Sequence, residues 1–295
     1  MPALPLVLLF TLCCGTSSDS VGPGSGQEVE LTDLSGPYLG QTPPGSTPVL
    51  FAPGFVSRES IFEHSGAVFS PDGTEVYWAA KPDGDSLFHI YFMRITDGRW
   101  TAPAMTPFSQ SHEGNRPTFS PDGQRLYFQT IRNPVGGPIL VVEREGDGWS
   151  EPSALPASIN ATGLERPYSV TADGSLYFGR GIMEDDEILV SRMVAGQLSQ
   201  PVPAEGAFDS PYTELHAFVS PDEDYMILED TDHESHCAMG ISYRQEDGTW
   251  SEQVPLDFGW ARFPVVSPDG DYLFFMGQEG IYWVSTSFVE GLRPG

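Results

Sequence analysis

Short apolar runs recur along the chain, each interrupted by a turn sequence and followed by a second run rich in β-formers. The pattern is clearest at Phe69-Ser-Pro-Asp-Gly73, after which the chain continues as Val76-Tyr-Trp78. Proline pre-sets φ at the second position of such a turn, and glycine accepts the positive φ that ends it. Each copy therefore predicts one strand entering a tight turn and another leaving it.

The turn recurs at a spacing typical of propeller blades. Its aspartates are Asp72, Asp122, Asp173, Asp222 and Asp269, so the intervals run from 47 to 51 residues. An interval of this length accommodates a four-stranded unit rather than one hairpin. No stretch shows a sustained helical period. The sequence therefore predicts an all-β fold: a five-bladed β-propeller of four-stranded antiparallel blades, with strands A to D in each.

The last unit is one strand short, and the N-terminal segment contains a match for it. The fifth unit, from Phe263 to Ser285, supplies three strands. Ala52-Pro53 lies 18 residues before Pro71, as Ala102-Pro103 lies 18 residues before Pro121. We therefore expect the segment from Val49 to Val56 to be the D strand of the last blade. Such closure removes the sheet edges that an open ring would expose.

The N-terminus reads as an export signal. Residues 1–14 hold an apolar core that is too short to span a bilayer, and we interpret them as a signal peptide. Thr11-Leu-Cys-Cys14 resembles a bacterial lipobox, which would make Cys14 a lipid anchor. It departs from that pattern because Cys13 is not a small residue and the leader has no Lys or Arg. A plain cleaved signal, or a wrongly assigned start codon, is the alternative.

The remaining chain divides into a linker and one domain. Residues 15–44 are rich in Gly, Ser, Thr and Pro and predict a flexible linker, while residues 45–295 form the propeller. The formal charge is −27, with 41 acidic and 14 basic residues. A phosphate-binding surface needs a basic patch, so we exclude nucleic acid as a partner. The acidic surface serves solubility or, alternatively, a partner of complementary charge.

Several short motifs resemble a known group of proteins. They are Tyr38-Leu-Gly-Gln41, Pro43-Pro-Gly45, Phe51-Ala-Pro-Gly54 and Ile281-Tyr-Trp-Val284. On these residues the chain resembles the TolB-like, WD40-like propeller-repeat proteins of bacterial cell envelopes, and more closely an exported group with no assigned activity. The resemblance covers about residues 37 to 293. It implies the propeller fold and an exported location, in the periplasm or on the outer cell surface, and it carries over no catalytic residue.

Charged residues recur just before strand A of each blade. In a meander, the A–B and C–D turns share one end of the ring, here called the turn end, and the B–C loops and D–A crossings share the other, the loop end. Residues before strand A should line the mouth of the central channel at the loop end, where propellers bind ligands. The candidates are Glu63, His64, Glu113, Arg116, Glu165, Arg166, Glu214, His216 and Arg262. Alternatively, these residues pair with each other and tie neighbouring blades.

The B–C loop of the fourth blade departs from the group it resembles and contains metal-ligand types. His233, His236 and Cys237 occur within the stretch Glu229 to Cys237. Imidazole and thiolate suit zinc or another borderline metal, but structural zinc sites draw ligand pairs from two places. The alternative is a solvated acidic loop with a partly buried thiol. We expect no other cofactor.

These observations predict a monomeric, non-catalytic binding protein of the cell envelope, whose partner is an envelope protein or a glycan. The alternative is a glycoside hydrolase that uses paired carboxylates among Glu63, Glu113, Glu165 and Glu214, with Trp78, Tyr168 or Trp260 as sugar platforms. These glutamates recur at equivalent positions in the repeat, whereas acid and base catalysis needs carboxylates in unlike environments. The binding function is therefore favoured.

Overall fold

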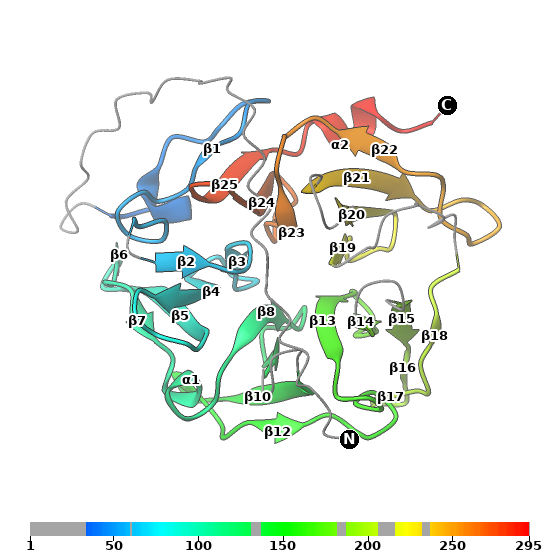
Figure 1. The fold of residues 1–295 in the computed structure, drawn as a ribbon, viewed down its shortest axis with the longest axis horizontal. Helices are drawn as coiled ribbons and strands as arrows, with labels where there is room; N and C mark the ends of the chain where they lie inside the picture. The colour runs from blue at the N-terminus through cyan, green and yellow to red at the C-terminus, as the bar shows by residue number, and fades with distance from the viewer. Residues whose placement is uncertain are drawn as a thin grey trace, which may run out of the picture.

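The strands form a ring of five blades. The computed structural model describes residues 34–59, 61–130, 137–181, 187–205, 216–231 and 237–294. Within these ranges the chain forms antiparallel sheets that stand around one central axis, with the first strand of each nearest the axis (Figure 1). The predicted five-bladed β-propeller is confirmed. No helix among these residues is long and apolar enough to cross a membrane.

The first three blades each add a short outer hairpin or strand extension to the basic meander. Blade 1 comprises β2 (Ile61–Glu63), β3 (Val68–Phe69), β4 (Glu75–Pro82), β5 (His89–Thr96), β6 (Arg99–Trp100) and β7 (Ala104–Met105). Blade 2 comprises β8 (Asn115–Phe119), β9 (Arg125–Gln129), β10 (Ile139–Glu145), β11 (Gly148–Trp149) and β12 (Ser153–Ala154). Blade 3 comprises β13 (Glu165–Val170), β14 (Leu176–Arg180), β15 (Glu187–Ser191), β16 (Met193–Val194), β17 (Gln197–Leu198) and β18 (Val202–Pro203).

The last two blades are simpler. Blade 4 comprises β19 (Ala217–Val219), β20 (Tyr225–Thr231), β21 (Cys237–Tyr243) and β22 (Val254–Leu256). Blade 5 comprises β23 (Arg262–Val266), β24 (Tyr272–Gly277), β25 (Gly280–Ser285) and the N-terminal β1 (Val49–Leu50). Helical turns are short: η2 (Pro37–Gly40), α1 (Pro107–Ser111) and α2 (Phe288–Gly291).

The N-terminal strand closes the ring as expected. Val49 pairs with Trp283 and Leu50 with Tyr282, and the Phe51 N–H donates to the Ile281 carbonyl at 2.7 Å. The regular pairing is short, because the chain turns away at Ala52, which has a φ of 45°. Phe51 is nevertheless fully buried in the apolar core between the last and first blades. The closing segment therefore acts through packing as much as through backbone pairing.

The propeller begins earlier than the sequence predicted. Leu34 and Leu39 are buried in the same core as Phe51, and Trp100 N–H donates to the Leu34 carbonyl at 2.9 Å. Tyr38 packs against that core, and its hydroxyl donates to Asp269. Residues 34–44 are therefore part of the folded domain, and the predicted linker is too long at this end. The burial of these few large apolar side chains orders the segment in spite of the Gly and Pro residues around them.

The recurring turn is held by its own side chains. The Ser120 hydroxyl donates to Asp122 at 2.6 Å, and the same carboxylate accepts the Gln124 N–H at 3.0 Å. These two hydrogen bonds lower the pKa of Asp122 below its ordinary value. The other blades repeat the arrangement with Asp72, Asp173, Asp222 and Asp269. The turn aspartates are thus satisfied locally.

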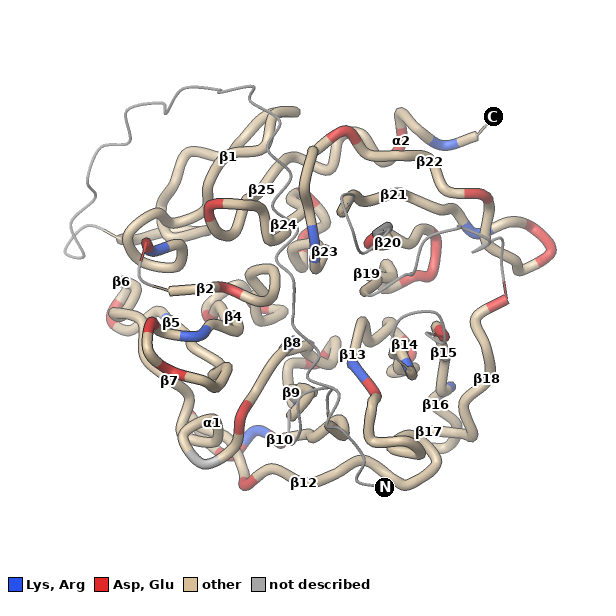
Figure 2. The backbone as a smooth tube through the Cα atoms, in the orientation of Figure 1, with Lys and Arg blue, Asp and Glu red and all other residues tan. Residues whose placement is uncertain are grey.

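Acidic and basic positions both occur on the perimeter of the ring. Basic positions also mark the inner ends of β13 and β23, and an acidic position lies beside the basic one on β13 (Figure 2). The chain as a whole is strongly acidic. Basic groups at the axis therefore need a specific structural or functional reason.

Candidate functional site

Five of the predicted residues lie at the axis, and four of them contact one buried phenylalanine, Phe263. Each blade contributes one of them: His64, Arg116, Arg166, His216 and Arg262. Together with Phe263, they are called the axial cluster below. The Phe263 ring lies 4.6 Å from the His64 ring and 5.6 Å from the His216 ring, and it carries the guanidinium groups of Arg116 at 5.1 Å and Arg262 at 4.7 Å.

Irregular inner strands bring these side chains to the axis. The pairing register shifts between Asn115 and Thr118 in β8 and between Arg262 and Val265 in β23, and β13 has a similar shift. A proline lies within the shifts of β8 and β23 and at the edge of that in β13, where its missing N–H interrupts the ladder. Arg116 and Phe263 have φ values of 53° and 56°, which are unusual for residues other than glycine. Strained backbone of this kind is common at functional sites.

One histidine of the cluster has a defined tautomer. Asn115 accepts the Arg116 N–H on its side-chain oxygen at 2.9 Å, so its amide nitrogen is free to donate to His64 Nδ1 at 2.7 Å. His64 Nδ1 is therefore an acceptor, and the ring proton is on Nε2. Burial, with Arg116 adding repulsion, lowers the pKa of His64 well below its ordinary value. The imidazole is neutral at pH 7.

Arg116 and His216 are both buried and have nitrogens without a hydrogen-bond partner among the described residues. Arg116 is 8% exposed, and its Nε and Nη1 have no hydrogen-bond partner among the described residues. Burial, together with the charge of Arg166, lowers the pKa of Arg116 to about 9. His216 is 4% exposed, its Nδ1 is likewise unpartnered within the described part of the chain, and burial lowers its pKa well below the ordinary value.

Arg262 differs from Arg116 because a carboxylate neutralises it. Its Nε donates to Glu229 Oε1 at 2.6 Å, and Glu229 Oε2 accepts the Phe263 N–H at 3.3 Å. Glu229 belongs to blade 4 and Arg262 to blade 5, so this buried pair ties two blades together. Sequence reasoning missed Glu229 in this role, because it lies on strand B rather than before strand A.

The predicted glutamates serve the backbone instead of facing one another. Glu63 accepts the Arg58 N–H at 3.3 Å, and Glu113 accepts the Phe88 N–H at 3.2 Å. Burial raises the pKa of Glu63 to about 7. Glu165 is fully buried and accepts the N–H groups at positions 162 and 163 as well as Arg180. Glu214 lies outside the described residues.

An aromatic path leads from the cluster to the surface of blade 1. The His64 ring lies 4.6 Å from the Phe88 ring, which lies 6.1 Å from the Phe62 ring. Phe62 is 44% exposed, and Leu87 on the adjacent B–C loop is 43% exposed. The sequence analysis did not single out these residues. Phe263 could have been found, since it lies six residues before its turn aspartate, as Arg116 and His216 do.

The proposed sugar platforms are mostly unsuited to that role. Trp78 is fully buried and stacks on Tyr91, so its selection is wrong: it belongs to the core between blades. Tyr168 is buried beside His216, with ring centroids 4.8 Å apart. Trp260 is partly exposed. Burial follows from strand position, because side chains in the middle of an inner strand pack against the neighbouring blade.

The blade-four metal hypothesis cannot be decided from the described residues. Cys237 is buried at the start of β21. His233 and His236 lie outside the described part of the chain. Within the described ranges, no group of three or more His, Cys, Asp or Glu side chains is placed to hold a metal ion. The metal site remains a prediction.

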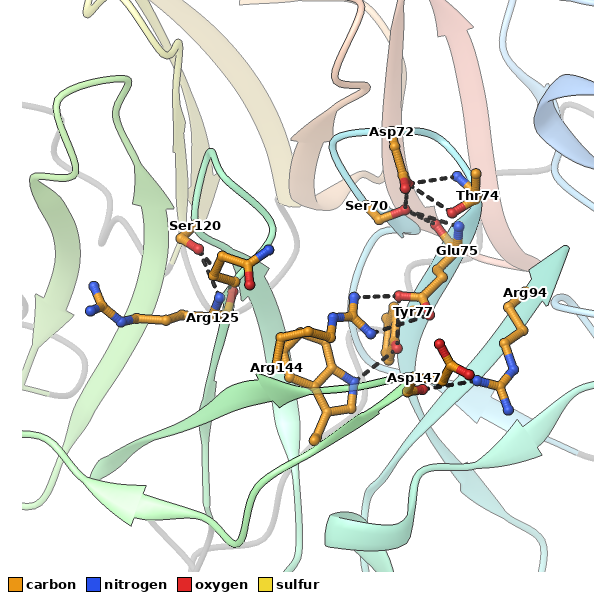
Figure 3. Close-up of polar contacts among 12 residues, drawn as sticks. Ser70, Asp72, Thr74, Glu75, Tyr77, Arg94, Ser120, Arg125, Arg144 and Asp147 are labelled. Carbon is orange, nitrogen blue, oxygen red and sulfur yellow. Dashed lines mark hydrogen bonds and ion pairs between the residues drawn. The ribbon is translucent and has the colours of Figure 1, made fainter.

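A polar cleft lies at the turn end, opposite the predicted mouth. It has a volume of about 620 Å³ and lies between blades 1 and 2, where its lining includes Asp72, Arg94, Gln124, Arg144 and Asp147. Its charged groups have partners: Arg144 donates to Glu75, and Arg94 donates to the Asp147 carbonyl at 3.0 Å (Figure 3). The cleft was not predicted, and its side chains are engaged in holding the two blades together.

Comparison with known proteins supports the fold only. No protein-family model and no curated protein matches the sequence. Similar solved structures include TolB from Acinetobacter baumannii, with 16% sequence identity, a TM-score of 0.47, and coverage of 77% of this chain and 52% of that chain. A TolB candidate from Agrobacterium tumefaciens has 19% identity, a TM-score of 0.45, and coverage of 72% and 69%.

A third similar structure is a periplasmic gluconolactonase from Pseudomonas aeruginosa. It has 19% identity and a TM-score of 0.41, and the match covers 71% of this chain and 64% of that chain. This chain thus spans about half the length of the Acinetobacter TolB. TolB proteins are thus among the similar structures, while the five-bladed fold rests on the strand arrangement of this chain, and likenesses of this size transfer no activity.

Proposed function

We propose that the protein is a non-catalytic binding propeller of the bacterial cell envelope. Its ligand, an envelope protein or a glycan, docks on the loop end and reaches the mouth of the central channel. The observation that carries this proposal is the axial cluster, to which all five blades contribute a charged or titratable residue. Groups that converge from separate elements on one point are typical of ligand sites.

Export and anchoring complete the proposal. The apolar leader would carry the chain out of the cytoplasm, and lipid on Cys14 would hold it at a membrane while the propeller acts as a monomer. The strongly acidic composition keeps such a domain soluble.

Hydrolysis is less well supported than binding. A glycosidase needs one carboxylate as acid and another as base or nucleophile on either side of the scissile bond. Glu165 instead accepts backbone N–H groups in its own loop and pairs with Arg180. Glu63 and Glu113 likewise accept backbone N–H groups. These interactions hold the loops and the D–A crossings in place, so the repeated glutamate has a structural role.

Site-specific cross-linking tests where ligands dock. A photo-reactive phenylalanine analogue is placed at position 62, on the loop end, and in a matched protein at position 194, on the hairpin of β16 and β17. Phe62 and Val194 are both exposed apolar residues, so neither change should disturb the core. After irradiation in isolated cell envelopes, mass spectrometry identifies protein or glycan adducts.

We expect adducts from position 62 and few from position 194. Incubation of the unmodified protein with purified peptidoglycan and with the identified adduct partner should release no soluble product. Adducts from position 194 alone would contradict docking at the loop end. Release of sugar fragments that stops in a Glu113→Gln variant would replace the binding function with the hydrolase.

A further inference from the structure

Arg116 is a buried cation that forms no ion pair with a carboxylate among the described residues. It is more than nine-tenths buried, and two of its nitrogens have no hydrogen-bond partner among the described residues. Arg166 and Arg262 act on it with charge of the same sign, and the opposing charge of Glu229 is already paired with Arg262. An uncompensated buried charge costs several kcal/mol, so proteins rarely retain one without a counter-ion. The chain retains this buried charge although it has 41 acidic residues, any of which could in principle supply a counter-charge.

His216 provides a second donor from another blade. Its Nδ1 lacks a partner within the described ranges, and a neutral imidazole can carry its proton on that nitrogen. Arg116 and His216 both contact the ring of Phe263. A guanidinium and an imidazole N–H beside one ring suit a planar, singly charged group with two acceptor oxygens. A carboxylate has this chemistry.

The path outward from the cluster is apolar. The rings of His64, Phe88 and Phe62 follow one another from the axis toward the rim, with Leu87 exposed nearby. A glycan would need several polar partners for its hydroxyl groups along this path, whereas a peptide side chain would be well accommodated. A chain end can also reach a site at the axis with a single backbone segment, whereas an internal loop would have to bring two.

We propose that the axial cluster binds the C-terminal carboxylate of a polypeptide ligand, and that the aromatic path holds an apolar side chain at its last residues. Arg116 and His216 take the carboxylate oxygens, while Phe62 and Phe88 contact the apolar side chain. The proposal rests on the proposed function, since it names the ligand of that same loop-end site.

The test compares a carboxylate with its neutral amide. The probes are N-acetyl-Leu-Phe and N-acetyl-Leu-Phe amide, titrated calorimetrically into the full chain. The acid should bind at least about tenfold more tightly, the value expected for one charge-assisted hydrogen bond. Arg116→Gln should remove this preference. Arg94→Gln, in the turn-end cleft, should leave it unchanged, and thermal melts of both variants show that they fold.

Four results would overturn the proposal. Equal affinity for the acid and the amide would show that the site does not recognise a carboxylate. An unchanged preference for the acid in Arg116→Gln would show that Arg116 does not bind it. Binding of N-acetylmuramic acid, but not of N-acetylglucosamine or the peptide acid, would make the ligand a glycan. An acid preference that emerges only in Glu214→Gln would show that the chain neutralises Arg116 itself. None of these results alters where cross-links form, so the proposed function fails separately.

Discussion

Arg144 and Arg116 belong to the same blade but lie in opposite environments. Arg144, at the turn end, donates to both oxygens of Glu75 on the neighbouring blade, at 2.6 and 3.3 Å, and stacks 3.8 Å above the Trp149 ring (Figure 3). Arg116, at the axis, stacks on Phe263 but has buried nitrogens without a partner in the described part of the chain. Both cations rest on an aromatic ring, and only one has a counter-charge.

The difference separates a structural arginine from a candidate binding arginine. The perimeter pattern recurs between other blades, where Arg192 pairs with Glu223 and Arg293 with Asp224. A chain that repeatedly supplies carboxylates to its outer arginines could supply one to Arg116 as well. The proposed external anion would account for the lack of a carboxylate paired with Arg116 among the described residues.

The largest effect is expected at the neutralised arginine of the axis. Glu229→Gln keeps the shape of the side chain but removes the carboxylate that neutralises the half-buried Arg262. Breaking a buried ion pair on one side costs about 3–5 kcal/mol. Denaturant titration should show a loss of this size in the free energy of unfolding. A loss below about 1 kcal/mol would mean that the charged side chains at the axis are well solvated. The axis and the perimeter would then not differ in how strongly they require a counter-charge.

A smaller loss is expected at the perimeter. Arg144→Gln removes a two-point ion pair and a stacked cation, so we expect about 2 kcal/mol of destabilisation. The control is Arg125→Gln, since Arg125 pairs with Glu143 at 3.3 Å with both side chains largely exposed. Such pairs contribute about 0–1 kcal/mol. If both variants lose the same amount, the perimeter pairs are not what joins the blades.

The burial of the Glu63 carboxylate at the loop end should make the free energy of unfolding depend on pH. Because the pKa of Glu63 is raised to about 7, the folded protein favours its protonated form. Stability from this group is therefore complete below about pH 4.5 and is lost as the pH rises through 7. Glu63→Gln should raise stability by about 3 kcal/mol at pH 8 and by almost nothing at pH 4.5. A gain that does not depend on pH would rule out titration as the cause.

Most of the fold could be predicted from the sequence, because its repeats are local and periodic. The turns carry Pro-Asp-Gly chemistry with two exceptions: Ala172 replaces proline in the third, and Glu223 takes the glycine position of the fourth with a φ of 58°. The same periodicity located the closing strand and one axial residue per blade. The start of the domain was harder to locate, since the burial of Leu34 and Leu39 depends on contacts with distant strands.

The chemistry of the site depends on which partner each charged side chain finds, and spacing alone does not give this. Glu165 and Arg166 are adjacent in sequence, yet Glu165 binds its own loop and Arg180 while Arg166 belongs to the axial cluster. Phe62 lies on β2 and Phe88 lies just before β5, and their rings form one path only when β2 and β5 flank β4. Pairing across blades is long-range information that a repeat pattern does not contain.

The most direct test of the contrast is the stability of ligand-free Arg116→Gln, measured by denaturant titration beside Arg144→Gln. If Arg116 is a buried cation held for an external anion, its neutralisation should increase the free energy of unfolding by about 1–2 kcal/mol, because an uncompensated charge is removed. Arg144→Gln should decrease it. A decrease for Arg116→Gln of similar size would show that Arg116 is already neutralised within the propeller, and it would contradict the account.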